Sequence, residues 1–380
     1  MTDLGPNAGL IGIPGSRGRL DTPALILDLD LLERNIATMA AHARAVGVAL
    51  RPHAKTHKSI RIAELQMAAG ALGVCCATMG EAEIMVRARI PGVHISSPQV
   101  TPAKIARLIA LNAENHRGLS VVVDNPGNLA EIEAAARNGG KPLDILVDFY
   151  ANHGRTGAAT EADAVALAQA VAQSGILRFR GIQAYAGNLQ HVAVRAERRA
   201  RTLEVLKRVA AIVERLESLG IKVPVVTGAG TGTFDLDPEA RVFTELQVGS
   251  YVFMDVDYNR ALKEGRNELP FETSLFVQTA VVSTNAPDWV TCDAGLKSFA
   301  TEGPKPEIAR GAPAGSTYTW FGDEHGKLIL PAGAPRPEIG HKIECVTPHD
   351  DPTVNLHDFY HVVRGDTLVE IWPVDARGKR

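Results

Sequence analysis

The stretch RPHAKTHK, residues 51–58, lies where one periodicity of the sequence ends and another begins. The apolar run 46–50 precedes it and a helix-like apolar pattern resumes at Ile60, so the stretch is predicted to lead from a strand end into a helix. Strand ends of this kind carry the chemistry of α/β barrels. Lys55 is the residue of interest, because a lysine fixed at a strand terminus can lose its proton and attack a carbonyl as the free amine. A solvated basic loop is the alternative, since basic clusters are common on surfaces.

Outward from this stretch, strands and helices alternate along the chain. Strand patterns occur at 24–30, 48–54, 73–77, 93–96, 119–123, 144–149, 178–185, 223–227 and 243–249. Helical patterns occur at 57–70, 80–89, 101–116, 126–138, 160–174 and 192–219, besides a first helix that Asp30 is expected to cap and that ends near residue 46. Several strands, such as SVVVD and LDILVD, are continuously apolar, which is typical of strands buried on both faces. The eight strands from 48–54 onward predict a closed (β/α)8 TIM-type barrel. The competing Rossmann fold needs a G-x-G-x-x-G after the first strand, and the sequence has none there.

The pattern of residue types along the sequence changes at about Phe271. Short β-type runs follow, separated by glycine, proline and acidic residues, and helical periodicity is lost. This pattern predicts a second, antiparallel β domain. We expect an N-terminal arm at 1–22, the barrel at 23–270 and the β domain at 271–380. The length of 380 residues agrees with two domains, because single cores stop growing at roughly 250–300 residues.

Composition excludes several classes of function. A net charge of −3 without a basic stripe argues against nucleic acid or an anionic membrane as a partner. No apolar stretch approaches the roughly 18 residues of a membrane span, and the first residues lack a signal peptide's cationic leader and apolar core. We therefore expect a cytoplasmic protein. The four cysteines show no C-x-x-C spacing and indicate neither a zinc knuckle nor a disulfide framework.

Further polar groups follow the predicted barrel strands. Arg155 comes after 144–149, and Tyr185 and His191 lie at and after the end of 178–185. The loop GAGTGT, 228–233, follows 223–227 and exposes successive backbone N–H groups and hydroxyls, as a phosphate requires. Phosphate sites in barrels recur on the loops after the last two strands, although a plain glycine-rich turn is the alternative. A lysine after the first barrel strand and this glycine-rich loop together are a more specific signal of a functional site than either feature alone.

These motifs resemble the D-threonine aldolase and D-serine dehydratase-like family of fold-type III, or alanine-racemase-like, pyridoxal-phosphate enzymes. The similarity runs nearly end to end, through DTPALILDLDLLERNI, RPHAKTHK, GVCC, QAYAGNLQH, TGAGTGTF, TELQVGSYVFMDVDY, DAGLKS, DEHG, PHDDPTVNLHD and WPVDARG. The resemblance implies that Lys55 carries pyridoxal 5'-phosphate and that Arg155 faces its pyridine nitrogen. It implies that His349 and Asp351 bind a metal ion. The residues that it places around the phosphate and ring are Tyr185, Gly230, Thr231, Gly232, Ser250 and Tyr251.

A metal ion has a chemical purpose beside such a cofactor. An arginine at the pyridine nitrogen keeps that nitrogen unprotonated and weakens the cofactor as an electron sink. A divalent cation, Mn²⁺ or Mg²⁺, on the substrate's β-hydroxyl would compensate by lowering the hydroxyl pKa. His349 and Asp351 offer an imidazole and a carboxylate two residues apart, on one face if the segment is extended. An H-x-D triplet in an arbitrary protein is more often a surface loop, but the longer PHDDPTVNLHD match favours the metal.

Three more residues are candidates for the site. His191 is a candidate to handle the proton of the β-hydroxyl, and a structural hydrogen bond is the alternative. His53 flanks Lys55 and is expected to position or tune it. Asp323, in DEHG, would contact the substrate or a metal-bound water, or else cap a β-turn.

The predicted function is reversible aldol cleavage of a small β-hydroxy-D-amino acid, D-threonine-like, to glycine and an aldehyde. The rival is a dehydratase acting on D-serine or 3-hydroxy-D-aspartate. Relatives that dehydrate D-serine tend to have a cysteine where Asp351 stands, which favours the aldolase. A 3-hydroxy-D-aspartate aldolase stays open. A non-catalytic pyridoxal-phosphate carrier would lack the β domain, and an alanine-racemase-like enzyme would not need the metal pair. Fold-type III relatives are commonly dimers, so a homodimer is expected by analogy.

Overall fold

A computed structural model describes residues 4–115, 117–151, 154–263 and 269–380. Contacts between Cα atoms divide the chain into two compact units. Residues 39–55, 62–249 and 379–380 form the first, here named the barrel unit. The remaining segments, up to residue 38 together with 56–61 and 250–378, form the second, here named the β unit.

The barrel unit is built on a parallel sheet. Within the described ranges this sheet has eight strands, in the order β2-β9-β8-β7-β6-β5-β4-β3. The strands are β2 (Ala49–Leu50), β3 (Cys75–Cys76), β4 (Val93–Ile95), β5 (Leu119–Val123), β6 (Leu143–Asp148), β7 (Leu177–Ala184), β8 (Val225–Gly228) and β9 (Glu245–Leu246). The two ends of this order meet, because His53 and Cys75 form a parallel bridge and the N–H of Ala54 donates to the carbonyl of Cys75 at 2.7 Å. The closed parallel barrel predicted from the sequence is confirmed.

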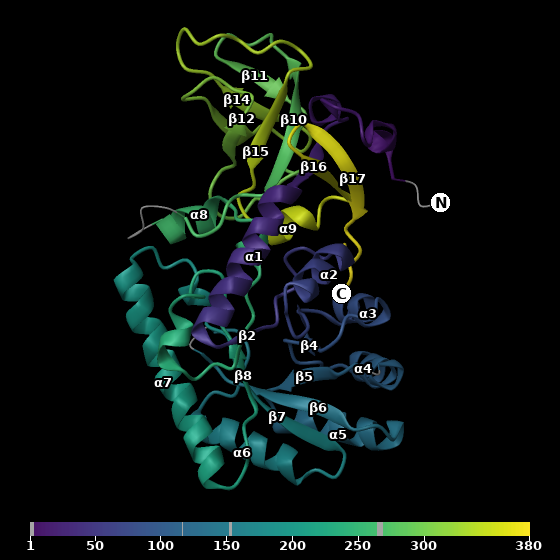
Figure 1. Ribbon diagram of the computed structural model, residues 1–380, viewed down its shortest axis with the longest axis vertical. Helices are drawn as coiled ribbons and strands as arrows, with labels where there is room; N and C mark the ends of the chain where they lie inside the picture. The colour runs from purple at the N-terminus through teal and green to yellow at the C-terminus, as the bar shows by residue number, and fades with distance from the viewer. Residues whose placement is uncertain (1–3, 116, 152–153, 264–268) are drawn as a thin grey trace. The chain divides into compact units, whose positions relative to one another are not determined.

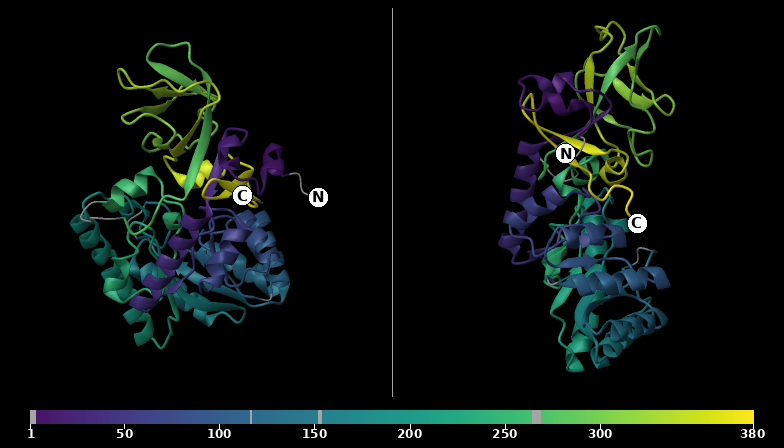
Figure 2. Two further views of the ribbon diagram at one scale, coloured as in Figure 1. Left: turned by 45° about the horizontal axis from the view of Figure 1, so that its top comes forward. Right: turned by 90° about the vertical axis from the view of Figure 1, so that its right-hand side faces the viewer.

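Helices cover the outer face of this sheet (Figure 1). They are α2 (Ile60–Ala68), α3 (Met79–Arg87), α4 (Pro102–Glu114), α5 (Pro126–Gly139), α6 (Glu161–Gln173) and α7 (Arg195–Ser218). Polar caps begin several of them: the side chains of Thr78, Thr101, Asn125 and Thr160 accept backbone N–H groups of the first turn. Figure 2 shows the same helices outside the strands from two further directions. No α-helix joins β8 to β9 in the described residues, where the link contains the 3-10 helix Asp237–Ala240.

The first helix begins earlier than predicted. Helix α1 (Leu29–Val46) already includes Asp30 in its first turn. The capping side chain is that of Asp28, whose Oδ1 accepts the N–H of Leu31 at 3.3 Å. The predicted cap at Asp30 is therefore wrong by two residues, because an aspartate at either position suits a helix start and the tertiary context decides between them.

The β unit holds a second sheet, which is mixed but mostly antiparallel. Its nine strands within the described ranges are β1 (Ala24–Asp28), β10 (Leu275–Ser283), β11 (Trp289–Cys292), β12 (Glu307–Arg310), β13 (Thr317–Trp320), β14 (Gly326–Ile329), β15 (Lys342–Val346), β16 (Phe359–Arg364) and β17 (Thr367–Pro373). The main path is β13-β14-β11-β10-β1-β16-β17, and β15 joins β10 to β12. Helices α8 (Val256–Lys263) and α9 (Asp350–Val354) belong to the same unit. The predicted antiparallel β domain is confirmed as a fold.

Strand β1 pairs in this second sheet. It lies antiparallel to β10 and parallel to β16, so the chain starts in the β unit before it enters the barrel. The observed units therefore differ from a division at residues 22 and 270. All five residues of β1 are buried, and a continuously apolar strand carries no local mark of the sheet it joins.

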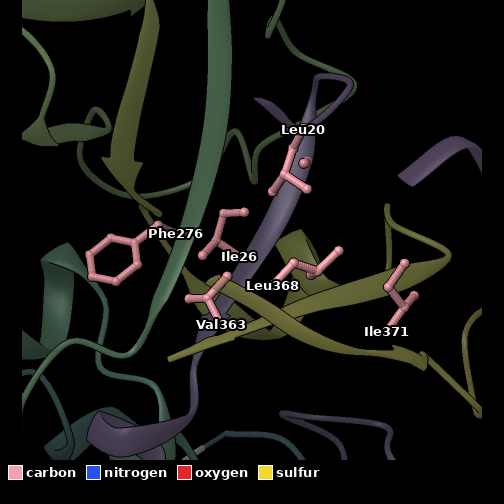
Figure 3. Packing of buried hydrophobic residues seen from close by; sticks show 7 residues of the cluster. Leu20, Ile26, Phe276, Val363, Leu368 and Ile371 are labelled. Atoms are coloured by element: carbon pink, nitrogen blue, oxygen red, sulfur yellow. The ribbon is translucent and has the colours of Figure 1, made fainter. Parts of the chain in front are cut away.

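The core of the β unit gathers around β1. Alternate side chains of β1 and residues of β10, β16 and β17 pack against one another (Figure 3). The buried members of this cluster are Leu20, Ala24, Ile26, Phe276, Val363, Leu368 and Ile371. Arg17 ties the preceding segment to the sheet, with Nε and Nη2 donating to the Glu344 carboxylate at 2.8 and 2.7 Å. The predicted N-terminal arm thus contains two 3-10 helices and a buried ion pair to Glu344.

Candidate active site

Lys55 lies at the carboxyl end of β2, two residues beyond the bridge that closes the barrel. The segment leading to it is held rigidly. The N–H of Lys55 donates to His53 Nδ1 at 3.4 Å, and His53 Nε2 lies 3.0 Å from Ser96 Oγ. Both ring nitrogens of His53 thus lie within hydrogen-bonding distance of neighbouring groups, and the positioning role predicted for His53 stays a prediction.

The glycine-rich loop 228–233 follows β8. Strand β9 separates β8 from β2 in the parallel sheet, so Lys55 and this loop leave the sheet at the same edge. Space around the loop is tight: a Cβ atom at Gly230 would lie 2.4 Å from Gln190 Oε1, and one at Gly232 would lie 1.9 Å from the carbonyl oxygen of Gln190. Glycine is therefore required at position 232, where the close contact is with backbone atoms of Gln190, whereas a Cβ at position 230 would displace the end of the Gln190 side chain. The N–H of Gly232 is engaged too, since it donates to Gln190 Oε1 at 2.9 Å.

Arg155 and Tyr185 come together in the barrel unit. The Arg155 guanidinium carbon lies 5.5 Å from the centroid of the Tyr185 ring, a cation–π distance. Asp148, at the end of β6, binds the side chain of Thr156, the residue after Arg155. Its Oδ2 accepts Thr156 Oγ1 at 2.7 Å and its Oδ1 accepts Gln183 Nε2 at 2.9 Å. Burial raises the pKa of Asp148 to about 6, although both hydrogen bonds oppose that rise.

Four other predicted residues are not part of these contacts. His191 is exposed at the end of the loop after β7. Asp323 is exposed in the turn between β13 and β14, and its carbonyl accepts the N–H of Lys297 at 3.0 Å. Ser250 and Tyr251 are buried and belong to the β unit, where Ser250 Oγ donates to Asp350 Oδ1 at 3.1 Å. The bond from Ser250 is not foreseen from the sequence, because its partner lies 100 residues further along the chain.

A group of potential metal ligands forms in the β unit. Ligand atoms of Asp255, His349 and Asp350 all lie within 4.8 Å of one another. His349 Nδ1 is 2.8 Å from Glu302 Oε1, so a carboxylate orients the imidazole. Asp351, predicted as a ligand, is half-buried and not a member of this group.

The local structure at 349–351 differs from the expectation. Helix α9 begins at Asp350 with His349 as its N-cap residue, so the predicted extended segment is wrong. The helix is favoured because the N–H of Asp351 donates to Asp350 Oδ1 at 2.7 Å and Thr353 Oγ1 donates to the His349 carbonyl at 2.7 Å.

Asp255 is not among the residues predicted from the sequence. Its Oδ1 accepts the N–H of Tyr258 at 2.8 Å and caps α8, while its Oδ2 accepts the N–H of Asp350 at 3.0 Å. Burial raises the pKa of Asp255 to about 6, although the hydrogen bond from the Tyr258 N–H opposes this rise. The aspartate in FMDVDY signals a helix cap, but nothing local shows that the same carboxylate reaches Asp350.

Comparison with known proteins decides the family. The family model of the alanine racemase N-terminal domain matches residues 27–257, and that of the putative serine dehydratase domain matches residues 274–363. The chain is 43% identical to the D-threonine aldolase of Arthrobacter sp over 360 residues, which cover 95% of this chain and 93% of that protein. The chain belongs to the D-threonine aldolase and D-serine dehydratase-like family of fold-type III pyridoxal-phosphate enzymes.

Two further relatives support this membership in the fold-type III family. The chain is 37% identical to the 3-hydroxy-D-aspartate aldolase of Paracoccus denitrificans, over 97% of this chain and 95% of that protein. The crystal structure of D-threonine aldolase from Filomicrobium marinum matches with a TM-score of 0.90 at 41% identity, over 95% of this chain and 96% of that one. The family predicted from the motifs is therefore confirmed. Within the described residues, no helix has the length and apolar character needed to cross a membrane.

The residues of the barrel unit fit the family's cofactor. A lysine and a glycine-rich loop share one edge of the sheet, and the close packing at Gly230 and Gly232 holds the loop in one shape. In the β unit, the imidazole and carboxylates around His349 form a donor set suited to a divalent cation.

Proposed function

We propose that this protein is a pyridoxal-phosphate-dependent carbon–carbon lyase that cleaves β-hydroxy-D-amino acids of the D-threonine type reversibly to glycine and an aldehyde. Two observations support the proposal: a strand-end lysine followed by a glycine-rich loop at the same sheet edge in the barrel unit, and, within the β unit, a divalent-metal donor set around His349. The 43% identity to a D-threonine aldolase over nearly the whole chain supports the same reaction. We further propose that the protein works as a homodimer in the cytoplasm, by analogy with fold-type III enzymes.

The barrel residues have distinct roles in this proposal. Lys55 binds the carbonyl carbon of pyridoxal phosphate through its amine. Arg155 would face the pyridine nitrogen and would leave it unprotonated, because a guanidinium does not give up its proton. The remaining residues that we assign to the cofactor's ring and phosphate are Tyr185, Gly230, Thr231 and Gly232 of the barrel unit and Ser250 and Tyr251 of the β unit. When bound, pyridoxal phosphate withdraws electrons from the substrate's Cα, and the unprotonated ring makes that withdrawal weak.

Because the cofactor is a weak electron sink, cleavage needs further stabilisation at the substrate's β-hydroxyl, and residues of the β unit would supply it by holding a metal ion. His349 and Asp351 hold a divalent cation, Mn²⁺ or Mg²⁺, in this proposal. Such a cation lowers the pKa of a bound hydroxyl. Of the other two members of the donor set around His349, Asp350 adds a carboxylate toward the same cation in this proposal. Asp255 accepts a backbone N–H with each of its oxygens, so we assign it to shaping the loop around His349. His191, exposed at the end of its loop, is the side chain that we assign to accept the β-hydroxyl proton.

Product identification tests the proposal directly. The purified protein, supplied with pyridoxal phosphate and Mn²⁺, should convert D-threonine to glycine and acetaldehyde, because the cleaved bond joins Cα to Cβ. L-threonine should react far more slowly, since the barrel face fixes the side of the cofactor on which the substrate is held. A keto acid with ammonia would identify a dehydratase instead. Comparable turnover of L-threonine would contradict the assignment to D-amino acids.

A second candidate is cleavage of 3-hydroxy-D-aspartate to glycine and glyoxylate. The 37% identity to a 3-hydroxy-D-aspartate aldolase over 97% of the chain favours it. It is the same bond cleavage on a substrate with a carboxylate side chain. The ratio of kcat/KM for D-threonine and 3-hydroxy-D-aspartate separates the two candidates.

Asp255→Asn should weaken metal binding without removing it. The amide would turn an NH₂ group toward one of the two backbone N–H donors that Asp255 now accepts, so the loop at Asp350 would shift. We expect a loss of roughly tenfold in Mn²⁺ affinity, the lower end of the range for groups behind a metal ligand, measured by paramagnetic resonance titration.

Asp288→Asn, in the exposed turn after β10, is the matched control and should bind Mn²⁺ as the unaltered protein does. Unchanged affinity in Asp255→Asn would refute the positioning role. A loss as complete as that of His349→Ala would make Asp255 a direct ligand.

A further inference from the structure

Gln190 connects the loop after β7 to the glycine-rich loop after β8. Its Oε1 accepts the N–H of Gly232 at 2.9 Å, and its Nε2 donates to Thr233 Oγ1 at 3.1 Å and to the Ala186 carbonyl at 3.2 Å. Thr233 Oγ1 in turn donates to Asp237 Oδ2 at 2.5 Å. The result is a chain of bonds from a backbone N–H to a carboxylate.

Every bond in this chain has a fixed direction. A backbone N–H can only donate, so the Gln190 oxygen must face Gly232 and its amide nitrogen must face Thr233. The Thr233 hydroxyl has one proton, and because Nε2 also donates to it, that proton goes to Asp237. The orientation of the Gln190 amide is thus determined by its partners.

The chain is also deeply buried. Gln190, Thr233 and Asp237 are exposed by 1, 2 and 4% respectively. Buried polar networks rigidify their surroundings when every member is satisfied, and they are costly when one partner is lost. The adjacent backbone has little freedom, since Ala229 has a φ of 66° and Gly230 and Gly232 touch Gln190.

We propose that Gln190 is a positioning residue that, through Thr233 and Asp237, fixes the glycine-rich loop in the conformation that binds the cofactor's phosphate. This inference rests on the proposed function, because it takes the loop as the phosphate site. Gln190 does not touch the phosphate itself; it sets the backbone whose N–H groups do. The loop therefore selects the phosphorylated form of the cofactor.

The test compares two forms of the cofactor. Apoenzyme of Gln190→Met, which keeps the length of the side chain but not its hydrogen bonds, is titrated with pyridoxal phosphate and with pyridoxal by fluorescence quenching. We expect the Kd for pyridoxal phosphate to rise about tenfold, the worth of a single hydrogen bond, and the Kd for pyridoxal to change less than about twofold. Gln173→Met, at the exposed end of α6, is the matched control and should change neither Kd.

A second pair of variants covers the case that Gln190→Met does not fold. Thr233→Val breaks the chain of hydrogen bonds and should lower the affinity for pyridoxal phosphate but not that for pyridoxal. Thr233→Ser keeps the hydroxyl and should bind both forms as the unaltered protein does. If Gln190→Met and Thr233→Val raised the Kd values for pyridoxal phosphate and pyridoxal equally, or raised neither, the positioning role would be overturned. If the unaltered apoenzyme bound neither form, the proposed function itself would fail, and the two failures are therefore distinguishable.

Discussion

Lys55→Ala should yield a protein that does not retain pyridoxal phosphate through purification and that cleaves D-threonine at the background rate, a loss on the order of 10³-fold or more. The amine of Lys55 is the group at the end of β2 that can bond to the cofactor's carbonyl carbon, and alanine has no atom to replace it. The absorbance of the bound cofactor and the release of glycine measure the two effects separately.

Lys104→Ala, on the exposed face of α4, is the control for a lost lysine charge and should keep both cofactor and activity. Reduction of the unaltered holoenzyme with borohydride, followed by peptide mapping, should place the cofactor on Lys55. A label on another lysine, such as the buried Lys58 in the same stretch, would refute the assignment.

The barrel could be predicted because its strands are local signals. A strand buried on both faces is continuously apolar, and each predicted barrel strand overlaps an observed one, from β2 to β9. The helical pattern predicted at 160–174 agrees with α6, which Thr160 caps by accepting the N–H of Asp163 with its hydroxyl. Lys55 and the 228–233 loop could be paired in advance because parallel strands place their carboxyl ends on one edge.

What could not be predicted depends on contacts between distant residues. Strand β1 is as apolar as the barrel strands, and only its pairing with β10 and β16 assigns it to the β unit. Asp255 meets Asp350 across 95 residues. Gln190 belongs to QAYAGNLQH, one of the motifs through which the sequence resembles the family. Its hydrogen bond to Gly232 spans 42 residues, and no periodicity of the sequence predicts it.

Removal of the metal ion should separate cofactor binding from cleavage. Exhaustive chelation, or His349→Ala, should abolish the cleavage of D-threonine, with a loss on the order of 10²-fold or more, and leave the absorbance of the bound cofactor nearly unchanged. The reason is that Arg155 leaves the cofactor a weak electron sink, so bond breaking depends on a cation at the β-oxygen. Added Mn²⁺ or Mg²⁺ should restore the chelated protein but not His349→Ala.

The chemistry of the metal ligands determines which divalent ions can restore activity to the chelated protein. An imidazole and carboxylates without a thiolate bind several divalent ions with moderate affinity, so Mn²⁺, Mg²⁺ and Co²⁺ should each support some activity. His341→Ala, an exposed histidine of the same unit, is the control and should retain full activity. Undiminished cleavage after chelation, with metal analysis showing an empty site, would contradict the proposal. In that case the network of Asp255, Asp350 and Ser250 would serve only to fold the loop, since its hydrogen bonds need no metal ion.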